Sequence, residues 1–182
     1  NLLAENKATE DEVTKLELLM KQAKITTDDR RVTVAAKERL LKDKETSAAI
    51  ELNDGTIITA CTSELFGACA ALLLNALKHM AGINHDVKIL PKTVVEPIQK
   101  MKVDYLLGKN PRLHTDELLV ALSMLSVTDE NCRKAMEKLP ELKGAQVHTT
   151  VMLSEVDRKI FKKLGVMLTC EPISKKQKPL IG

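Results

Sequence analysis

The chain has 182 residues, 44% of them hydrophobic, which is enough apolar sequence to bury a sizeable core and excludes wholesale disorder. The 28 Lys and Arg residues barely exceed the 25 Asp and Glu residues, so the net charge of +3 gives no indication of a nucleic-acid partner. Aromatic residues make up only 2% of the chain, which argues against a single-strand binder that stacks bases on aromatic rings.

Residues 1–45 are predicted to form a helical appendage without a core of its own. Thr9 and Glu12 have the spacing of a capping box, and a second helix start is expected around Thr27. Apolar residues follow each start at helical spacing, so the appendage must pack on the rest of the chain or on a missing N-terminal part. Residues 42–47 are interpreted as a linker.

Residues 46–174 are predicted to form an α/β layered subdomain. Residues 48–60 indicate a hairpin around Asn53-Asp54-Gly55, because left-handed backbone is inexpensive there. The apolar stretch 63–82 indicates a buried helix, and residues 86–90 a short strand.

The remaining elements of the subdomain alternate in the same way. Residues 145–153 are β-branched and apolar on both faces, which is typical of a central strand. Alternating strands and helices predict a layered mixed sheet flanked by helices. Residues 175–182 are interpreted as a basic tail. The other predicted elements are a helix 93–107 with a capping box at 93–96, a helix ending near 126, a helix from 128 to before Pro140, a helix capped by Ser154, and a strand 166–170.

Cysteine usage and apolar run length bear on the compartment. No C-x-x-C pair and no secretory signal is present, which favours a reduced, cytoplasmic protein. The apolar run at residues 67–77 is too short to cross a bilayer, so we expect no membrane partner. The cysteines are Cys61, Cys69, Cys132 and Cys170.

The order of hairpin, buried helix, strand and helix resembles the cytidine-deaminase architecture. In that family the buried helix carries a zinc ligand two residues before a catalytic glutamate, and a P-C-x-x-C motif follows. Cys69 stands at the ligand position, but Ala71 replaces the glutamate and no P-C-x-x-C occurs. We therefore expect a deaminase-like architecture without the zinc motif, and predict no metal site.

The stretch KNPRLHTDELL, residues 109–119, is the main candidate for a binding site. Asn110 or Thr115 suffices to cap the helix, so the further cationic groups of Arg112 and His114 favour an anion at the helix start. The alternative is a solvated basic loop beside acidic neighbours. The predicted ligand-binding residues are Lys109, Asn110, Arg112, Thr115 and Asp116.

Two histidines are predicted to be catalytic, His114 and His148. Histidine changes charge near neutral pH, so His114 at the predicted anion site is suited to act as an acid or a base. His148 shares one face of the central strand with Gln146, Thr150 and Met152. It is either a hydrogen-bonded core residue or a site residue at the edge of a layer, and the sequence leaves both open.

Four runs together resemble one uncharacterised bacterial family, called domain of unknown function 1846. They are KLELLMKQAKIT, AAIELNDGTIITACTSELFGACAALLLNALK, VVEPIQKMKVDYLLGKNPRLHTDELLVALS and LPELKGAQVHTTVMLSEVDRKIFKKLGVMLTCEP. The resemblance implies that the chain is the C-terminal portion of a protein more than twice as long. It also implies an N-terminal part with a Gly-rich phosphate loop, G-x-G-S-G-K, for which this chain has no equivalent.

The expected function combines these points. The chain is predicted to be a subdomain that binds a small anionic molecule within a larger, nucleotide-dependent cytosolic enzyme. The nucleotide would be bound mainly by the missing N-terminal part, and we expect no cofactor in this chain. The expected partners are that part and further copies of the protein in a homo-oligomer. The alternative is a non-catalytic assembly module of the same protein.

Overall fold

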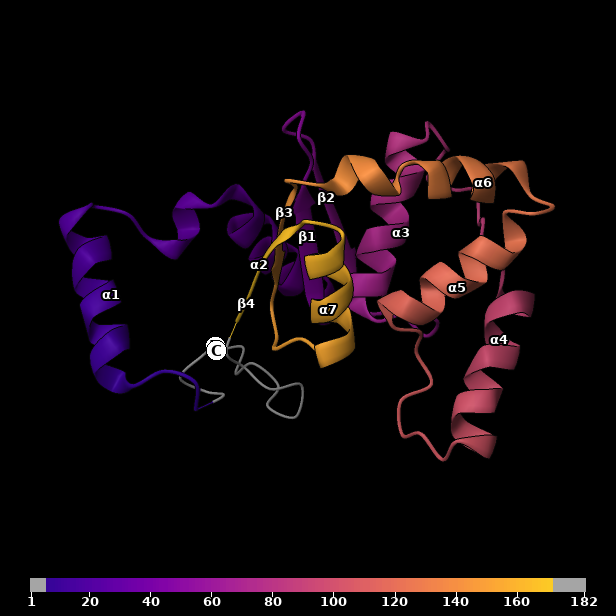
Figure 1. Cartoon of the computed structure of the whole chain (residues 1–182), viewed down its shortest axis with the longest axis horizontal. Coiled ribbons are helices and arrows are strands. Elements are labelled where there is room, and N and C mark those ends of the chain that lie inside the picture. The colour runs from indigo at the N-terminus through magenta and orange to yellow at the C-terminus, as the bar shows by residue number, and fades with distance from the viewer. Residues whose placement is uncertain (1–5, 172–182) are drawn as a thin grey trace.

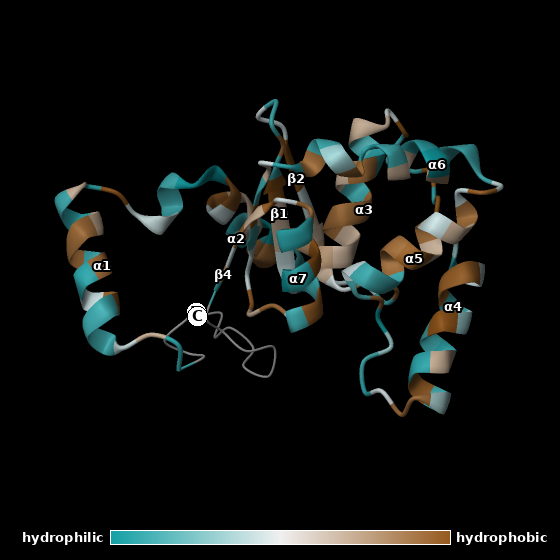
Figure 2. Cartoon of the chain, viewed as in Figure 1, coloured by the Kyte–Doolittle hydropathy of each residue, from teal (hydrophilic) through white to brown (hydrophobic). Residues whose placement is uncertain are grey.

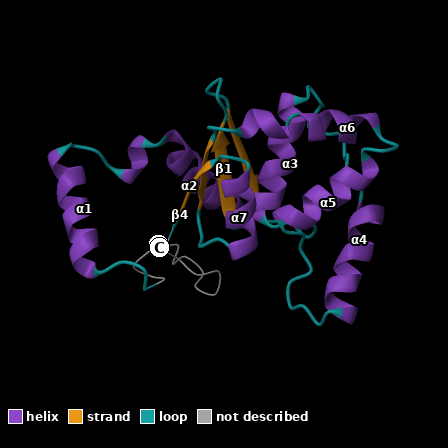
Figure 3. Ribbon diagram, in the orientation of Figure 1, coloured by secondary structure: helices purple, strands orange, loops and turns teal. Residues whose placement is uncertain are grey.

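The computed structural model describes residues 6–171, where a four-stranded sheet lies among helices (Figures 1 and 3). The strand order is β2-β1-β3-β4. β1 pairs antiparallel with both β2 and β3, whereas β3 and β4 are parallel, so the predicted mixed sheet is confirmed. The strands are β1 (Ser47–Glu51), β2 (Ile57–Cys61), β3 (Gln146–Thr149) and β4 (Met167–Cys170).

Helices make up most of the remainder of the described chain. The α-helices are α1 (Glu10–Gln22), α2 (Arg31–Asp43), α3 (Ala68–Met80), α4 (Lys92–Lys100), α5 (Thr115–Leu125), α6 (Glu130–Glu137) and α7 (Glu155–Lys163). Short 3-10 helices occupy Thr27–Asp29 and Leu139–Leu142, and a π-helical turn at Met101–Tyr105 continues α4. No helix within residues 6–171 has both the length and the apolar character that a bilayer crossing needs.

The two faces of the sheet are covered by different helices, because successive side chains of a strand point to opposite faces. Ala49 of β1 packs with Val32 and Ala36 of α2. Ala48 and Ile50, on the other face of β1, join the main core with α3. α2 therefore covers one face of the sheet and α3 covers the other. α7 lies on the same side as α3, because it contacts α5 and α5 contacts α3 (Figure 1).

α1 stands apart from these layers. The predicted capping box is confirmed, since the Glu12 carboxylate accepts from the Thr9 amide at 2.8 Å and the Glu12 amide donates to the Thr9 hydroxyl at 3.3 Å. No residue of α1 is buried, and Leu16 and Leu19 are more than half exposed. Figure 2 shows apolar residues alternating with polar ones along this helix. The domain boundary predicted at residue 45 stays a prediction; α2, within that segment, already packs on the sheet.

The predicted hairpin and the inner position of β3 are confirmed. Gly55 has a φ of +83°, and the Asp54 carboxylate accepts from the Thr56 amide, which closes the turn. β3 lies between β1 and β4. The Ser154 hydroxyl accepts from the Asp157 amide and caps α7, as predicted. The predicted tail, residues 175–182, lies outside the described residues.

Two predicted elements in the middle of the chain differ from the structure. α3 begins at Ala68 and not at residue 63, because Phe66 forms a parallel bridge with Leu113 and so keeps the preceding segment extended. The strand predicted at residues 86–90 is wrong. Ile89 and Leu90 of this segment are buried in the core without pairing to the sheet.

The start of α4 also differs. The capping box predicted at 93–96 is wrong, because Lys92 is already helical and Pro91 is the N-cap. Proline fits there, since its fixed φ suits an extended cap residue and its carbonyl accepts from the amide of Val94. Pro97 lies inside the helix, where it donates no backbone hydrogen bond.

Candidate functional site

The segment predicted to bind an anion is a loop that leads into α5. The Asn110 side-chain oxygen accepts from the Arg112 amide at 3.2 Å, which bends the loop. His114 is the N-cap of α5, and its amide donates to the Glu117 carboxylate at 2.9 Å. The expectation that Asn110 or Thr115 caps this helix is therefore wrong. A histidine serves here because a carboxylate one turn later satisfies its backbone amide.

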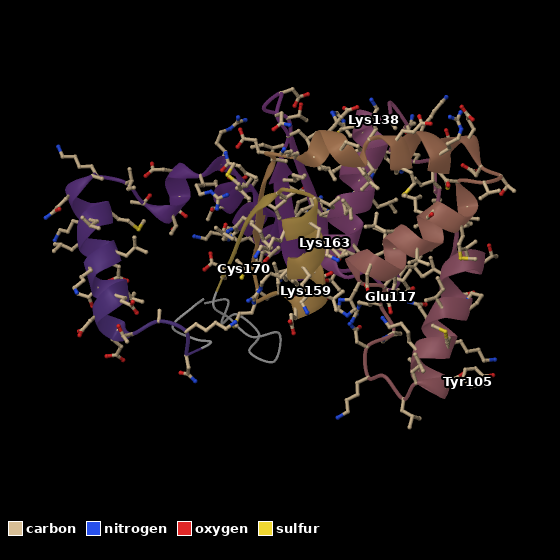
Figure 4. The ribbon with its side chains drawn as sticks, in the orientation of Figure 1. Tyr105, Glu117, Lys138, Lys159, Lys163 and Cys170 are labelled. Atoms are coloured by element: carbon tan, nitrogen blue, oxygen red, sulfur yellow. The ribbon has the colours of Figure 1, made fainter. Side chains whose placement is uncertain are left out.

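A buried lysine that the sequence did not single out holds this loop against α5. The Lys102 ammonium donates to the Arg112 carbonyl at 2.6 Å and to the Glu117 carboxylate at 2.7 Å. Lys102 belongs to the π-helical turn, a local irregularity often found near functional sites. Figure 4 labels Glu117 at the start of α5. No local sequence pattern identifies Lys102, because its partners lie 10 and 15 residues away.

Asp157, from the first turn of α7, connects that helix to α5. Its side chain is 5% exposed, and the His114 Nδ1 atom lies 3.2 Å from its Oδ2 atom. The Ser154 hydroxyl donates to the same oxygen at 2.6 Å. The Thr115 amide and hydroxyl donate to Oδ1 at 3.1 and 3.0 Å. One carboxylate thus joins the N-termini of two helices. The sequence indicated Asp157 only as part of a helix cap.

The protonation of Asp157 follows from these contacts. Burial by itself raises the pKa of the Asp157 carboxyl, but the hydrogen bonds from His114, Ser154 and Thr115 outweigh it and hold the pKa at about 2. Asp157 is therefore ionised at neutral pH and only accepts hydrogen bonds. The proton of a neutral His114 ring consequently sits on Nδ1, which makes Nε2 the acceptor nitrogen. The Asn110 amide nitrogen lies 3.5 Å from Nε2.

A small cavity of about 20 Å³ lies beside this pair, with room for about one water molecule. It is lined by His114 and Asp157, by Cys69 from the first turn of α3, and by Thr149 from β3. Cys69 is 5% exposed. Within residues 6–171 no group of three or more histidine, cysteine or acidic side chains is arranged to hold a metal ion.

The other predicted ligand-binding residues surround the loop. The Arg112 Nε atom donates to the Ser63 carbonyl at 2.6 Å, and within residues 6–171 its terminal nitrogens donate no hydrogen bond. Lys109 is exposed. The Asp116 carboxylate accepts from the Glu117 amide. Thr115 is fully buried, and both of its donors are used by Asp157. Direct ligand contact by these residues stays a prediction.

His148 lies on the opposite face of the sheet. It is the partner of Ala49 on the neighbouring strand β1, and Ala49 faces α2, so the His148 side chain points to the α2 face. The adjacent residue Thr149 points the other way and lines the cavity beside His114. Its Nδ1 atom lies 2.9 Å from the Thr169 hydroxyl, and its Nε2 atom lies 3.3 Å from the Glu171 carboxylate. The structure therefore brings Asn110, Arg112 and His114 together but leaves His148 apart.

Comparison with known proteins identifies the family. The model of the C-terminal domain of the family described as "Domain of unknown function DUF1846" matches residues 28–179. The chain belongs to this family. It is 49% identical over 165 residues to a UPF0371 protein of Corynebacterium urealyticum, covering 90% of this chain and 33% of that protein. It is 42% identical over 167 residues to a UPF0371 protein of Streptococcus pyogenes, covering 92% of this chain and 34% of the relative.

The DUF1846 match covers α2, the sheet and both helices of the His114 site. The chain spans about a third of the length of the curated relatives it matches. This agrees with a C-terminal portion of a larger protein, as the resemblance implied. The activity, substrate and partners of the whole protein are matters for proposal.

Proposed function

We propose that this DUF1846 domain is the small-molecule-binding subdomain of a larger enzyme and supplies His114 as its acid–base group. The observation that carries the proposal is the contact between His114 and the buried, ionised Asp157. A carboxylate on Nδ1 fixes the ring and its tautomer, so that Nε2 is ready to accept a proton from a bound molecule. The His114 side chain is 25% exposed and within reach of such a molecule.

An anionic ligand suits the loop in front of Nε2. The terminal nitrogens of Arg112 form a planar fork that matches a carboxylate or phosphate. The Asn110 amide, near Nε2, is placed to donate to the same molecule. Lys109 adds positive charge at the loop surface, while Thr115 and Asp116 hold the start of α5. The ligand would thus contact the loop, because the amides of His114, Thr115 and Glu117 at the start of α5 are already bound to carboxylates.

A deaminase-like origin for these layers is part of the proposal. The first turns of α3 and α7 meet at one cavity, which Cys69 and Asp157 both line. In cytidine deaminases, a helix start after the hairpin and a later helix start supply the zinc ligands. Here Ser154 and Asp157 have the three-residue spacing of the C-x-x-C pair but no sulfur. The hydrogen bond between His114 and Asp157 would lie where cytidine deaminases hold their zinc ion. Because residue 71 is alanine, no glutamate is present at that position to transfer protons.

We propose that a nucleotide is bound mainly by the remaining two-thirds of the protein. The resemblance places a phosphate loop there, and this chain has none. We propose that the missing N-terminal part brings the phosphates to the Arg112 loop, so the complete site forms between the two parts in the cytoplasm. His148, which is bound within the sheet, would then act in folding and not in chemistry.

An assembly module remains the second proposal, and exposed apolar side chains favour it. On α5, Val120 and Met124 are 61% and 72% exposed, although they lie one turn apart on one face. Tyr105, Leu106 and Leu107, after α4, are 76%, 68% and 82% exposed. Patches of this kind mark protein–protein contacts, so these side chains would contact the N-terminal part or a second copy in a homo-oligomer.

Metabolite profiling of the natively purified full-length protein tests the first proposal. We expect mass spectrometry to find an anionic metabolite that the wild-type protein retains and that Arg112→Gln and His114→Asn release. Arg133→Gln is the matched control, because Arg133 is an exposed arginine whose ion-pair partners among the described residues are acidic residues of its own helix. Equal retention by all four proteins would contradict the anion site at this loop.

A further inference from the structure

A second, larger pocket of about 430 Å³ opens beside α3. Residues 63–66, two side chains of α3, residues 87–90 and Lys92 line it, and it shares no lining residue with the cavity beside His114. Its volume lies in the range typical of small-molecule sites. Residues 87–90, which belong to the segment that does not join the sheet, form one of its walls.

The walls of this pocket are apolar and well packed. Phe66 and Leu74 are each 9% exposed, and Ile89 and Leu90 are 4% and 3% exposed. The Ile89 backbone is fixed by the Cys132 thiol, which donates to its carbonyl at 3.2 Å. These walls are therefore a preformed surface for an apolar body of several carbon atoms.

The charged groups of the pocket are mostly cationic. Lys78, Lys88 and Lys92 line it, against Glu64 alone among acidic residues. Lys78 is only 6% exposed, and its ammonium donates to the His85 carbonyl at 2.5 Å. Within residues 6–171 the His85 carbonyl takes one of the three donors of this ammonium, and the others can serve a ligand. Burial lowers the pKa of Lys78, while nearby Asp86 acts in the opposite direction. A bound anion would compensate this buried charge.

We propose that this pocket binds a small carboxylate that carries an apolar chain, with the carboxylate on Lys78 and the chain against Phe66, Leu74 and Ile89. A nucleotide fits less well, because the apolar walls offer few polar groups to a base or a sugar. The site goes beyond the function proposed for His114. The two are nevertheless adjacent, since the Leu113 amide donates to the carbonyl of Leu65 in the pocket wall at 2.9 Å.

Calorimetric titration of the chain with sodium octanoate tests the proposal. Hexanoate and butyrate shorten the chain, and we expect each methylene removed to weaken binding by about fourfold, because apolar burial contributes in proportion to area. 1-Octanol and octylamine keep the chain but change the head group. We expect the alcohol to bind at least about tenfold more weakly than octanoate, and the amine not to bind.

Variants locate the head group. Lys78→Met keeps the apolar stem and removes the charge, and we expect octanoate binding to weaken by at least about tenfold. Lys100→Met is the matched control, because Lys100 is exposed on α4 and does not line the pocket. Should Lys78→Met not fold, Val87→Glu replaces a wall residue that is 38% exposed and introduces a repelling carboxylate. We expect Val87→Glu to abolish octanoate binding.

The outcomes separate this site from the His114 site. Unchanged octanoate binding by His114→Asn would support two independent sites, whatever that variant does to metabolite retention. Octanol binding as tight as octanoate binding would overturn the proposal, and so would equal effects of Lys78→Met and Lys100→Met. The same titration with the full-length protein shows whether another segment of the protein fills the pocket. Loss of octanoate binding in the full-length protein would also overturn the proposal.

Discussion

His114 and His148 show how differently one fold can use the same side chain. His114 gives one ring nitrogen to buried Asp157 and turns the other toward a loop with Asn110, and its side chain is 25% exposed. His148 binds Thr169 and Glu171 with its two nitrogens, and its side chain is 6% exposed. A histidine available for chemistry is therefore distinguished by a reachable ring nitrogen that faces a polar loop and not by its sequence surroundings.

The largest expected effect comes from Asp157→Ala, because it leaves four donor groups, two of them on buried Thr115, without their acceptor. We expect a loss of about 3–5 kcal/mol in the free energy of unfolding at pH 7. The folded-state pKa of about 2 lies below the unfolded value, so about 2 kcal/mol of the stabilisation is present above pH 4 and is lost as the pH falls toward 2. Urea unfolding at pH 7 and pH 3 measures both.

Glu155→Gln is the control for Asp157→Ala, because Glu155 lies in the same first turn of α7 but its side chain is 77% exposed. Its unfolding midpoint should remain close to that of the wild-type chain. A loss as large as that of Asp157→Ala would show that the helix terminus, and not the contact with His114, determines the stability.

His148→Gln should have the next largest effect, about 1–3 kcal/mol, because Thr169 and Glu171 lose a buried partner. Burial lowers the pKa of His148, against the opposing effect of Glu171, and Arg30 and Lys37 lower it further. The unfolded chain therefore takes up the proton first, and this part of the stability is present above about pH 6.5 and lost as the pH falls. Thermal melting of wild type and variant between pH 5 and 8 should show a weaker pH dependence in the variant.

His114→Asn should cost less, about 1 kcal/mol, since Ser154 and Thr115 continue to donate to Asp157. Metabolite retention should nevertheless be lost in this variant and kept in His148→Gln. Chemical unfolding and metabolite profiling of both variants measure the contrast. The comparison between the histidines fails if His148→Gln releases the metabolite and His114→Asn retains it.

Arg112→Gln should have the smallest effect on stability, about 0.5 kcal/mol, because its backbone contacts are kept and, within residues 6–171, its side chain donates one hydrogen bond, from Nε to the Ser63 carbonyl. Phosphate should raise the melting temperature of the wild-type chain more than that of the variant, since ligand binding stabilises the folded state by mass action. Differential scanning fluorimetry across a phosphate series measures this. Identical shifts in both proteins would make Arg112 a structural clamp on Ser63.

The sequence predicted what depends on local pattern. The capping box at Thr9, the turn at Gly55 and the cap at Ser154 each use residues within three positions of one another, and the structure contains all three. The apolar segment 86–90 was assigned as a strand because local pattern does not show whether a sheet edge is near. Ile89 and Leu90 of this segment are buried in the core instead, and the Cys132 thiol donates to the Ile89 carbonyl.

The candidate site was predictable only in part, for the same reason. The loop around Arg112 and His114 has an unusual concentration of polar groups, which the sequence shows directly. Asp157, which orients His114, lies 43 residues further along the chain, and Lys102 lies in a helix that precedes the loop. Strand alternation placed His148 on one face, but only the packing of α2 shows that this face is opposite to His114.

Chemical modification of the histidines tests the central claim most directly, because diethyl pyrocarbonate reacts with accessible, neutral imidazole nitrogens. Exposed His79 and His85 serve as internal references, and peptide mass spectrometry reports each site in one experiment. We expect His114 to be modified along with the two references, and His148 to react only after the chain is unfolded. Modification of His148 at the rate of His79, or an unreactive His114 in the folded chain, would contradict the account.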